Sequence, residues 1–161
     1  MFKKLFFVIL IFCLFNNPII SQELPDGLYS NKYALVIGIN KYSGAFHSLE
    51  YAVSDAQAIT ETLQKRGFSV KTLIDEQATK ENIIRYLQRI RLIAEKDDLI
   101  IMYFSGHGHT ALNAKREEQG YLIPFGHKSA VDMEDALSME IFKEIADTRR
   151  NNQTLFLVDA C

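Results

Sequence analysis

Four runs of mainly apolar residues recur along the chain, and each has the character of a β-strand. They span residues 33–39, 68–74, 99–104 and 154–158. The runs are short and rich in β-branched and aromatic side chains. Most of them are apolar on both faces, which is typical of strands buried in a parallel sheet. We therefore expect these four segments to form the core of the molecule.

Segments with helical spacing separate the first three runs. Ser54 stands three residues before Gln57, which predicts a capping box at the start of a helix, and Gly67 predicts its end. Thr79 predicts the cap of a second helix. The apolar stripe expected along that second helix consists of Ile83, Ile84, Leu87, Ile90 and Ile93.

Two further segments lie between the third and fourth runs. Residues 138–148 predict a third helix, with Ile141, Phe142 and Ile145 facing inward. Residues 110–120 are polar and charged and predict a mobile loop. Strands that alternate with helices favour an α/β fold, in which helices cover both faces of a mostly parallel sheet.

The composition of the chain indicates which class of protein it belongs to. The chain has 161 residues, of which 48% are hydrophobic and 24% charged, and this is typical of one α/β domain with a real core. The formal net charge of −2 gives no broad basic surface, so we expect no nucleic-acid partner. Only two cysteines are present, Cys13 and Cys161, which excludes a disulfide framework.

The N-terminus has the pattern of a targeting segment. Lys3 and Lys4 precede an apolar stretch over residues 5–15, and a polar break follows. We predict an export signal over residues 1–21, which leads to a secreted or periplasmic protein. The alternative is an uncleaved membrane anchor, although eleven apolar residues are few for a membrane span. Residues 22–32 are then a lead-in, and residues 33–161 form the domain.

A histidine and a cysteine each follow a predicted strand. His107 lies beyond the run at residues 99–104, and Cys161 beyond the run at residues 154–158. Parallel strands bring their carboxyl ends to one edge of the sheet, so the two side chains can meet there. A cysteine attacks carbonyl groups as the thiolate and needs a nearby base, which His107 can supply. Gly108 can offer its N–H to a developing oxyanion.

Other interpretations of the same residues rank lower. Taken singly, His107 is also explained as a loop histidine and Cys161 as a small buried hydrophobe. His107, His109 and Cys161 could hold a metal ion, but no further ligand occurs at a spacing typical of zinc sites. The Gly-His-Gly segment is too short for a phosphate-binding loop. We predict no metal site.

Five blocks of sequence resemble the caspase-like cysteine peptidases, most closely the metacaspase and bacterial caspase-domain branch. Residues 103–108, Tyr-Phe-Ser-Gly-His-Gly, are similar to the family's histidine block. Residues 157–161, Leu-Val-Asp-Ala-Cys, are similar to its cysteine block. The three further blocks are residues 33–40, 49–56 and 120–124. The resemblance implies a caspase-like three-layer sandwich and an endopeptidase with a Cys161–His107 dyad and an oxyanion hole at Gly108.

The resemblance also implies a preference for substrates. An acid two residues before the nucleophile, here Asp159, implies cleavage after Arg or Lys, and Asp55 and Ser105 are implied to line the specificity pocket. Carboxylates suit a basic side chain entering a cleft. The alternative for Asp55 is an acid favoured by the dipole of a helix start. No cofactor is evident. Calcium activation is common in the branch, but no ligand cluster for it is identifiable here.

The family pattern continues beyond the cysteine with C-terminal strands that this sequence lacks. We therefore expect an exposed apolar sheet edge and a carboxylate near the thiol that disfavours the thiolate. This predicts little peptidase activity for the isolated chain and a C-terminal complementing segment as a partner. The alternative function is a non-catalytic caspase-like module used for binding or assembly.

Overall fold

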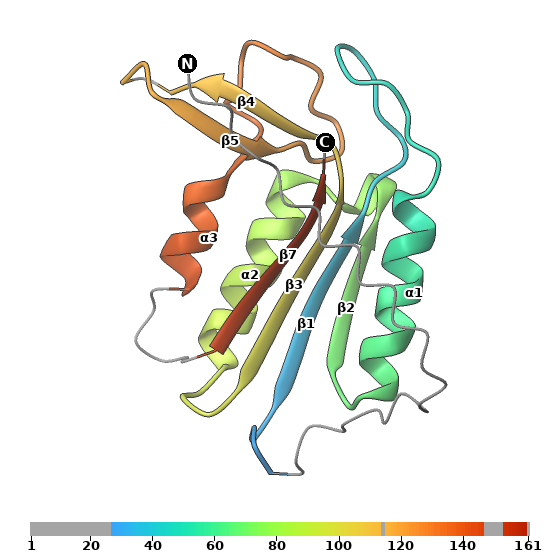
Figure 1. Ribbon diagram of the computed structural model, residues 1–161, viewed down its shortest axis with the longest axis vertical. Helices are drawn as coiled ribbons and strands as arrows, with labels where there is room; N and C mark the ends of the chain where they lie inside the picture. Colours follow the sequence, from blue (N-terminus) through green and yellow to red (C-terminus); the bar gives the residue numbers. More distant parts are fainter. Residues whose placement is uncertain (1–26, 114, 147–152, 161) are drawn as a thin grey trace, which may run out of the picture.

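A parallel sheet of four strands forms the centre of the computed structural model, which describes residues 27–113, 115–146 and 153–160 (Figure 1). The strand order is β2-β1-β3-β7. The strands are β1 (Lys32–Gly38), β2 (Ser69–Ile74), β3 (Leu99–Gly106) and β7 (Gln153–Ala160). All four coincide with the apolar runs, so this prediction is confirmed.

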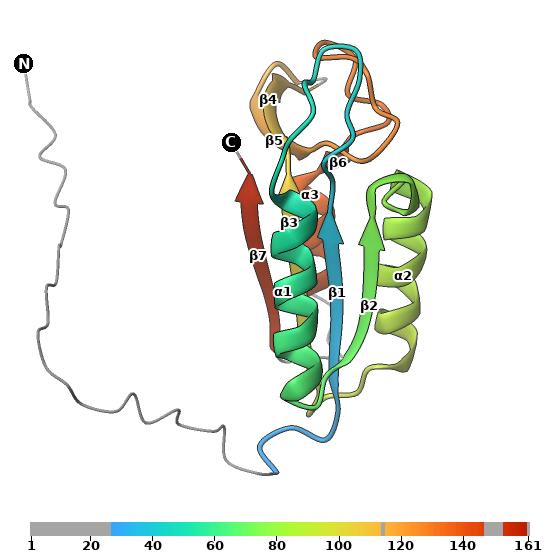
Figure 2. The same cartoon turned by 90° about the vertical axis from the view of Figure 1, so that its right-hand side faces the viewer.

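Helices cover both faces of this sheet (Figure 2). Helix α1 (Ala52–Lys65) packs on one face, against Val36 and Tyr103. Helices α2 (Lys80–Ile93) and α3 (Met139–Ala146) pack on the other, against Leu35 and Met102. Neighbouring residues of a strand point to opposite faces, so the two cores share the same strands. The result is a three-layer α/β sandwich.

Helix α2 follows most of the sequence pattern. The Thr79 side chain accepts a hydrogen bond of 3.3 Å from the Asn82 N–H, which confirms the predicted cap. Ile83, Leu87 and Ile90 are buried in the core. Ile93 is 50% exposed, so its place in the buried stripe was wrong. It is the last residue of the helix, where the chain already turns toward β3.

Helix α1 does not begin with the predicted capping box. It starts at Ala52, and the Ser54 hydroxyl lies inside its first turn and donates to the Tyr51 carbonyl at 2.7 Å. A residue from another part of the chain caps the helix instead. The Asn40 side-chain oxygen, just after β1, accepts a hydrogen bond of 3.1 Å from the Val53 N–H. A local sequence window cannot show a cap that is supplied at this distance.

The segment predicted as a mobile loop, residues 110–120, forms most of a β-hairpin instead. Strands β4 (Gly108–Leu112) and β5 (Glu118–Leu122) pair antiparallel, and β6 (Leu137–Ser138) extends this second sheet. The Asn113 side chain closes the turn by accepting from the N–H groups of Lys115 and Glu117, at 2.8 and 3.0 Å. A hairpin pairs locally and does not need an apolar run, which is why the hydrophobic pattern missed it.

Strand β7 lies at the edge of the parallel sheet. It pairs with β3 on one side, and no strand lies on its other side in the part of the chain that the structure describes. Leu155, Leu157 and Val158 are 47%, 40% and 43% exposed. An apolar edge strand of this kind matches the expectation drawn from the sequence.

The predicted export signal and Cys161 lie outside the described residues, as does the end of the third predicted helix at Thr148. Export and the division into signal, lead-in and domain stay predictions. Within residues 27–113, 115–146 and 153–160, no helix is both long and apolar enough to cross a membrane. A short 3-10 turn, η1 (Asp75–Gln77), joins β2 to the segment before α2.

Candidate active site

The carboxyl ends of β3 and β7 bring the predicted site residues to one edge of the sheet. The two strands are parallel, and their register places Ser105 beside Asp159 and Gly106 beside Ala160. His107 follows β3 directly. Open α/β sheets place their ligands outside this edge. Cys161 lies outside the described residues, but its neighbour Ala160 is at the same edge.

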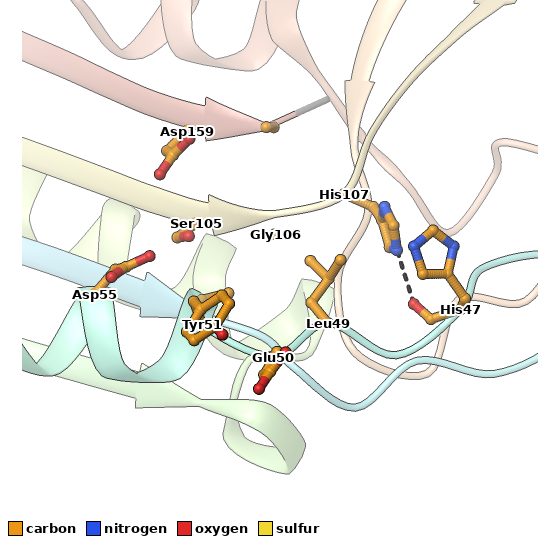
Figure 3. A pocket seen from close by; sticks show the side chains of 11 residues that line it. His47, Leu49, Glu50, Tyr51, Asp55, Ser105, Gly106, His107 and Asp159 are labelled. Carbon is orange, nitrogen blue, oxygen red and sulfur yellow. Dashed lines mark hydrogen bonds between the residues drawn. The ribbon is translucent and has the colours of Figure 1, made fainter.

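A pocket of about 330 Å³ opens at this edge (Figure 3). It is lined by His47, Leu49, Glu50, Tyr51, Ala52, Asp55, Ser105, Gly106, His107, Asp159 and Ala160. Four residues predicted from the sequence therefore share one cavity. Figure 3 shows Tyr51 and Asp55, from the start of α1, across the pocket from Ser105 and Asp159, from the strand ends. Gly108 stands just beyond the lining.

The imidazole of His107 is held in one orientation. The residue is only 8% exposed, and its Nε2 lies 2.8 Å from the carbonyl oxygen of His47 (Figure 3). A carbonyl oxygen can only accept, so Nε2 carries the hydrogen of this bond. Nδ1 of the neutral ring is then the nitrogen with a free lone pair. This arrangement suits a general base, because the lone pair is kept on one defined atom.

Tyr42 binds the backbone of His107. Its hydroxyl accepts from the His107 N–H at 3.0 Å and donates to the Ile123 carbonyl at 3.1 Å. The two rings meet edge to face, with centroids 4.6 Å apart. Burial raises the pKa of Tyr42 well above its ordinary value, although the bond from His107 opposes this. A Cβ at Gly106 would collide with this hydroxyl, so the approach requires glycine at that position.

Gly108 has a backbone N–H that the hairpin does not use. The Ile123 N–H donates to the His107 carbonyl at 3.0 Å, which makes Gly108 and Leu122 a non-hydrogen-bonded pair of the antiparallel ladder. The Gly108 N–H therefore points away from β5. A Cβ at Gly108 would lie 3.3 Å from that of Ala160, so the end of β7 passes close by. The role of Gly108 as an oxyanion donor stays a prediction, because Cys161 lies outside the described residues.

Acidic groups dominate the other end of the pocket. Asp55 is half-buried in the first turn of α1, Asp159 is exposed at the end of β7, and Ser105 is 4% exposed between them. Burial raises the pKa of Tyr103, and the carboxylates of Asp159 and Asp55 raise it further, against a hydrogen bond with Ser105. Asp55 and Asp159 therefore act on the same tyrosine, and both line this end of the pocket, which makes it acidic.

The sequence did not indicate three contributors to this site. His47 had no assigned role, yet its backbone carbonyl orients His107. Tyr42 was not singled out, although its hydroxyl binds the His107 backbone. A carbonyl group occurs in every residue and carries no signature in the sequence. Asp75 also acts from a distance, because its carboxylate accepts from the N–H groups of Asn40 and Lys41 at the start of this loop.

The described residues contain no cluster of metal-ligating side chains, and Cys161, one of the three ligands considered from the sequence, lies outside them. In the ranges that the structure describes, no group of three or more His, Cys, Asp and Glu side chains could hold a metal ion. The Nε2 atoms of His107 and His109 bond to two different carbonyls, those of His47 and Ala130. Each ring is therefore already engaged with its own backbone partner. Calcium activation stays a prediction.

Comparison of the sequence with models of known protein families assigns this chain to one of them. The model that matches this sequence is described as the caspase domain, and the match spans residues 31–161. The chain belongs to the caspase-domain family. Metacaspase-2 of Trypanosoma brucei brucei is 28% identical over 150 residues, which cover 84% of this chain and 42% of that protein. Metacaspase-1 of Meyerozyma guilliermondii is 34% identical over 118 residues, which cover 66% and 28% of the two chains.

The fold of this caspase domain also has a counterpart among solved structures. A crystal structure of a protein from Geobacter sulfurreducens superposes with a TM-score of 0.67 at 20% identity, covering 81% of this chain and 50% of that one. The fold class is the predicted caspase-like α/β sandwich. The chain spans less than half the length of the two metacaspases described above.

Proposed function

We propose that this caspase domain carries the catalytic residues of a cysteine endopeptidase of caspase or metacaspase type, which cleaves after Arg or Lys. Membership of the family supports a cysteine peptidase of this type. The observation that carries the finer proposal is the pocket where His107 meets Asp55, Ser105 and Asp159, next to the residue that precedes Cys161. The proposed base and the acidic cleft lie at one sheet edge, and the expected nucleophile follows Ala160 of that edge in the sequence.

In the proposed reaction, Nδ1 of His107 takes the proton of the Cys161 thiol, and the thiolate attacks the scissile carbonyl carbon. As the C–S bond forms, the electron pair of the carbonyl moves to its oxygen, and the Gly108 N–H donates to that oxyanion. The imidazolium then protonates the amine nitrogen as the C–N bond breaks. Water hydrolyses the thioester, and Nδ1 again accepts the proton. The bond to the His47 carbonyl supports this sequence because it leaves Nδ1 free.

The acidic end of the pocket supports the preference for basic residues. An Arg or Lys side chain entering from the substrate would approach Asp55 and Asp159 and could donate to the Ser105 hydroxyl. An acidic side chain would meet two like charges in the same space. Discrimination between the two classes therefore needs no further group.

We also propose a partner segment that pairs with β7. Its outer side has no strand in the described part of the chain, and Leu155 and Leu157 are exposed beside the pocket wall that Asp159 forms. An added strand would cover these side chains and fix the end of β7, from which Cys161 follows. We expect little peptidase activity from the isolated chain for this reason.

A peptide probe that reacts covalently with cysteine tests the proposal. It carries Arg next to the reactive group and is applied to the protein encoded by the complete reading frame, with the 161-residue chain alongside. We expect labelling of Cys161 that is lost in His107→Ala, and no labelling by a matched probe that carries Asp. Absent labelling of the complete, folded protein would favour the alternative, a non-catalytic binding or assembly module. Labelling by the Asp probe alone would overturn the role given to Asp159.

A further inference from the structure

Three of the four histidine rings lie around the Phe46 side chain in the loops above the sheet, and the fourth, that of His47, lies against His107. The centroids of His107, His109 and His127 lie 5.5, 5.9 and 5.9 Å from that of Phe46, and His47 lies 4.7 Å from His107. The proposed reaction uses the ring of His107 and the carbonyl of His47. The rings of His109 and His127 have no part in it, so the reason for their placement lies elsewhere.

The loop that carries Phe46 is docked on a second loop, residues 125–133, which follows β5. The Ala45 N–H donates to the Lys128 carbonyl at 2.9 Å. Gly44 has a φ of 72°, and a Cβ there would lie 2.5 Å from the same carbonyl oxygen. Only glycine permits both this backbone conformation and this approach. The two loops are therefore in direct backbone contact, close to the His47 carbonyl that orients His107.

Phe46 is the side chain inserted between the loops. It is 9% exposed and packs in a small cluster with Ile123 and Ala136, which are 0% and 4% exposed. Phe46 directly precedes His47, so its buried ring anchors the segment from which the His47 carbonyl, part of the next peptide group, projects. A shift of Phe46 would move the His47 carbonyl that accepts from His107.

The rings of His109 and His127 both lie against Phe46, and His109 belongs to β4 whereas His127 belongs to the second loop itself. Nε2 of His109 lies 3.0 Å from the Ala130 carbonyl oxygen, and Nε2 of His127 lies 2.6 Å from that of Ser129. His127 is 6% exposed. Each ring thus lies against Phe46, and each Nε2 bonds to a carbonyl of the second loop, from β4 for His109 and from within the loop for His127.

We propose that His109 and His127 are positioning residues, which hold Phe46 so that the His47 carbonyl keeps the His107 imidazole in its Nε2–H form. Neither residue lines the pocket. The effect of these residues on catalysis rests on the proposed function. Their effect on the orientation of His107 does not, because that orientation can be measured without any reaction.

The test is the tautomer of His107, read from the ring ¹⁵N signals of the labelled 161-residue chain. The wild type is expected to show one protonated and one unprotonated ring nitrogen for His107. His109→Leu removes the bond from β4 to the second loop, and His127→Leu removes a bond within that loop; both are expected to give averaged signals from both tautomers. His109→Gln and His127→Gln keep an N–H donor on the side chain and are expected to restore the single form. Val131→Ala is the control, because Val131 belongs to the same loop and is 91% exposed.

Each outcome decides the proposal. A single, unchanged tautomer in both folded leucine variants overturns it, because the two rings then serve stability alone. If the leucine variants do not fold, His109→Gln is compared with His109→Asn, whose shorter amide cannot span the distance to Ala130, and equal spectra overturn the proposal. In the labelling assay of the complete protein, the leucine variants should react with the Arg probe on the order of tenfold to a hundredfold more slowly. Absent labelling of the wild type would instead count against the peptidase and leave the tautomer result standing.

Discussion

His107 depends on two partners that are not themselves chemically reactive. The His47 carbonyl selects the tautomer of its ring, and the Tyr42 hydroxyl binds its backbone N–H. A base that must take a proton from a thiol gains from both, because a ring free to rotate would present its lone pair only part of the time. The orientation of one imidazole thus results from a carbonyl and a hydroxyl contributed by the loop after β1.

The charge of Asp159 is expected to set the preference for basic substrates. Asp159→Asn keeps the size of the side chain but removes the charge, and should slow labelling of Cys161 by the Arg probe about threefold to tenfold. The effect is modest because Asp159 is exposed and water screens it. The same substitution at Asp55, which is half-buried, should cost at least as much. Glu61→Gln removes one charge from the exposed side of α1 and should leave the rate unchanged. Equal rates for Asp159→Asn and Glu61→Gln would refute this role.

The Tyr42 hydroxyl should show itself in the alkaline stability of the protein. Its pKa is raised in the folded state above the ordinary value of 10.0, so the unfolded chain releases this proton first as the pH rises. The free energy of unfolding is then fully retained below pH 10.0 and falls above it. Tyr103 adds to the same trend through its own raised pKa. Urea unfolding at several pH values should give a shallower fall for Tyr42→Phe than for Tyr86→Phe, the half-buried control on α2. Identical slopes would contradict this.

Residue types with a chemical signature could be assigned from the sequence, and those without one could not. The pocket contains Asp55, Ser105, His107 and Asp159, all of which were singled out from motifs. The contribution of His47 was missed because it comes from the backbone, which looks the same at every position. Their catalytic roles stay predictions, since Cys161 lies outside the described residues.

Helices and strands followed the hydrophobic pattern where they are buried and departed from it at their ends. The four parallel strands were predicted because each is long enough and apolar enough to be recognised alone. The start of α1 was misplaced because its cap comes from Asn40, and the hairpin of β4 and β5 was missed because its pairing is local and polar. Terminal contacts of this kind depend on the tertiary structure.

Two substitutions compare the Asn40 cap of α1 with the capping box at Ser54 that the sequence predicted. Asn40→Ala removes the acceptor for the Val53 N–H and the donor to the Glu50 carbonyl, and should lower the free energy of unfolding by about 1–2 kcal/mol. Ser54→Ala removes only a hydroxyl within the first turn and should change it by less than about 0.5 kcal/mol. Urea unfolding followed by circular dichroism measures both. A larger loss for Ser54→Ala would reinstate the capping box.

The two edge strands of the parallel sheet differ in how well their apolar side chains are covered. Strand β2 closes one end of the sheet with only Ser69 of its six residues exposed, whereas β7 leaves three large apolar side chains exposed at the opposite end. Unpaired backbone groups on such a strand invite another strand to add. Self-association through β7 is therefore the expected behaviour of the isolated chain.

Charges placed on β7 should suppress this association. Leu155→Lys combined with Leu157→Lys places two positive charges on β7. When two copies of the chain pair through this strand, the charges of one copy repel those of the other. Light scattering of the 161-residue chain should show a clear fall in the concentration-dependent mass. Leu92→Lys is the matched control, because Leu92 is 74% exposed on α2 and not on a sheet edge. Equal suppression by both substitutions would show that the association has another origin.

The bond between His107 and the His47 carbonyl has a consequence for how this protein can change over evolutionary time. A group supplied by the main chain survives every side-chain replacement at its position, so codon 47 can drift without loss of the acceptor. The length of the loop cannot drift in the same way, because one residue inserted or deleted at residues 43–46 would displace that oxygen. In a saturation scan that selects for function, position 47 should therefore tolerate most substitutions. Single-codon insertions at residues 43–46 should be lost from the selected population.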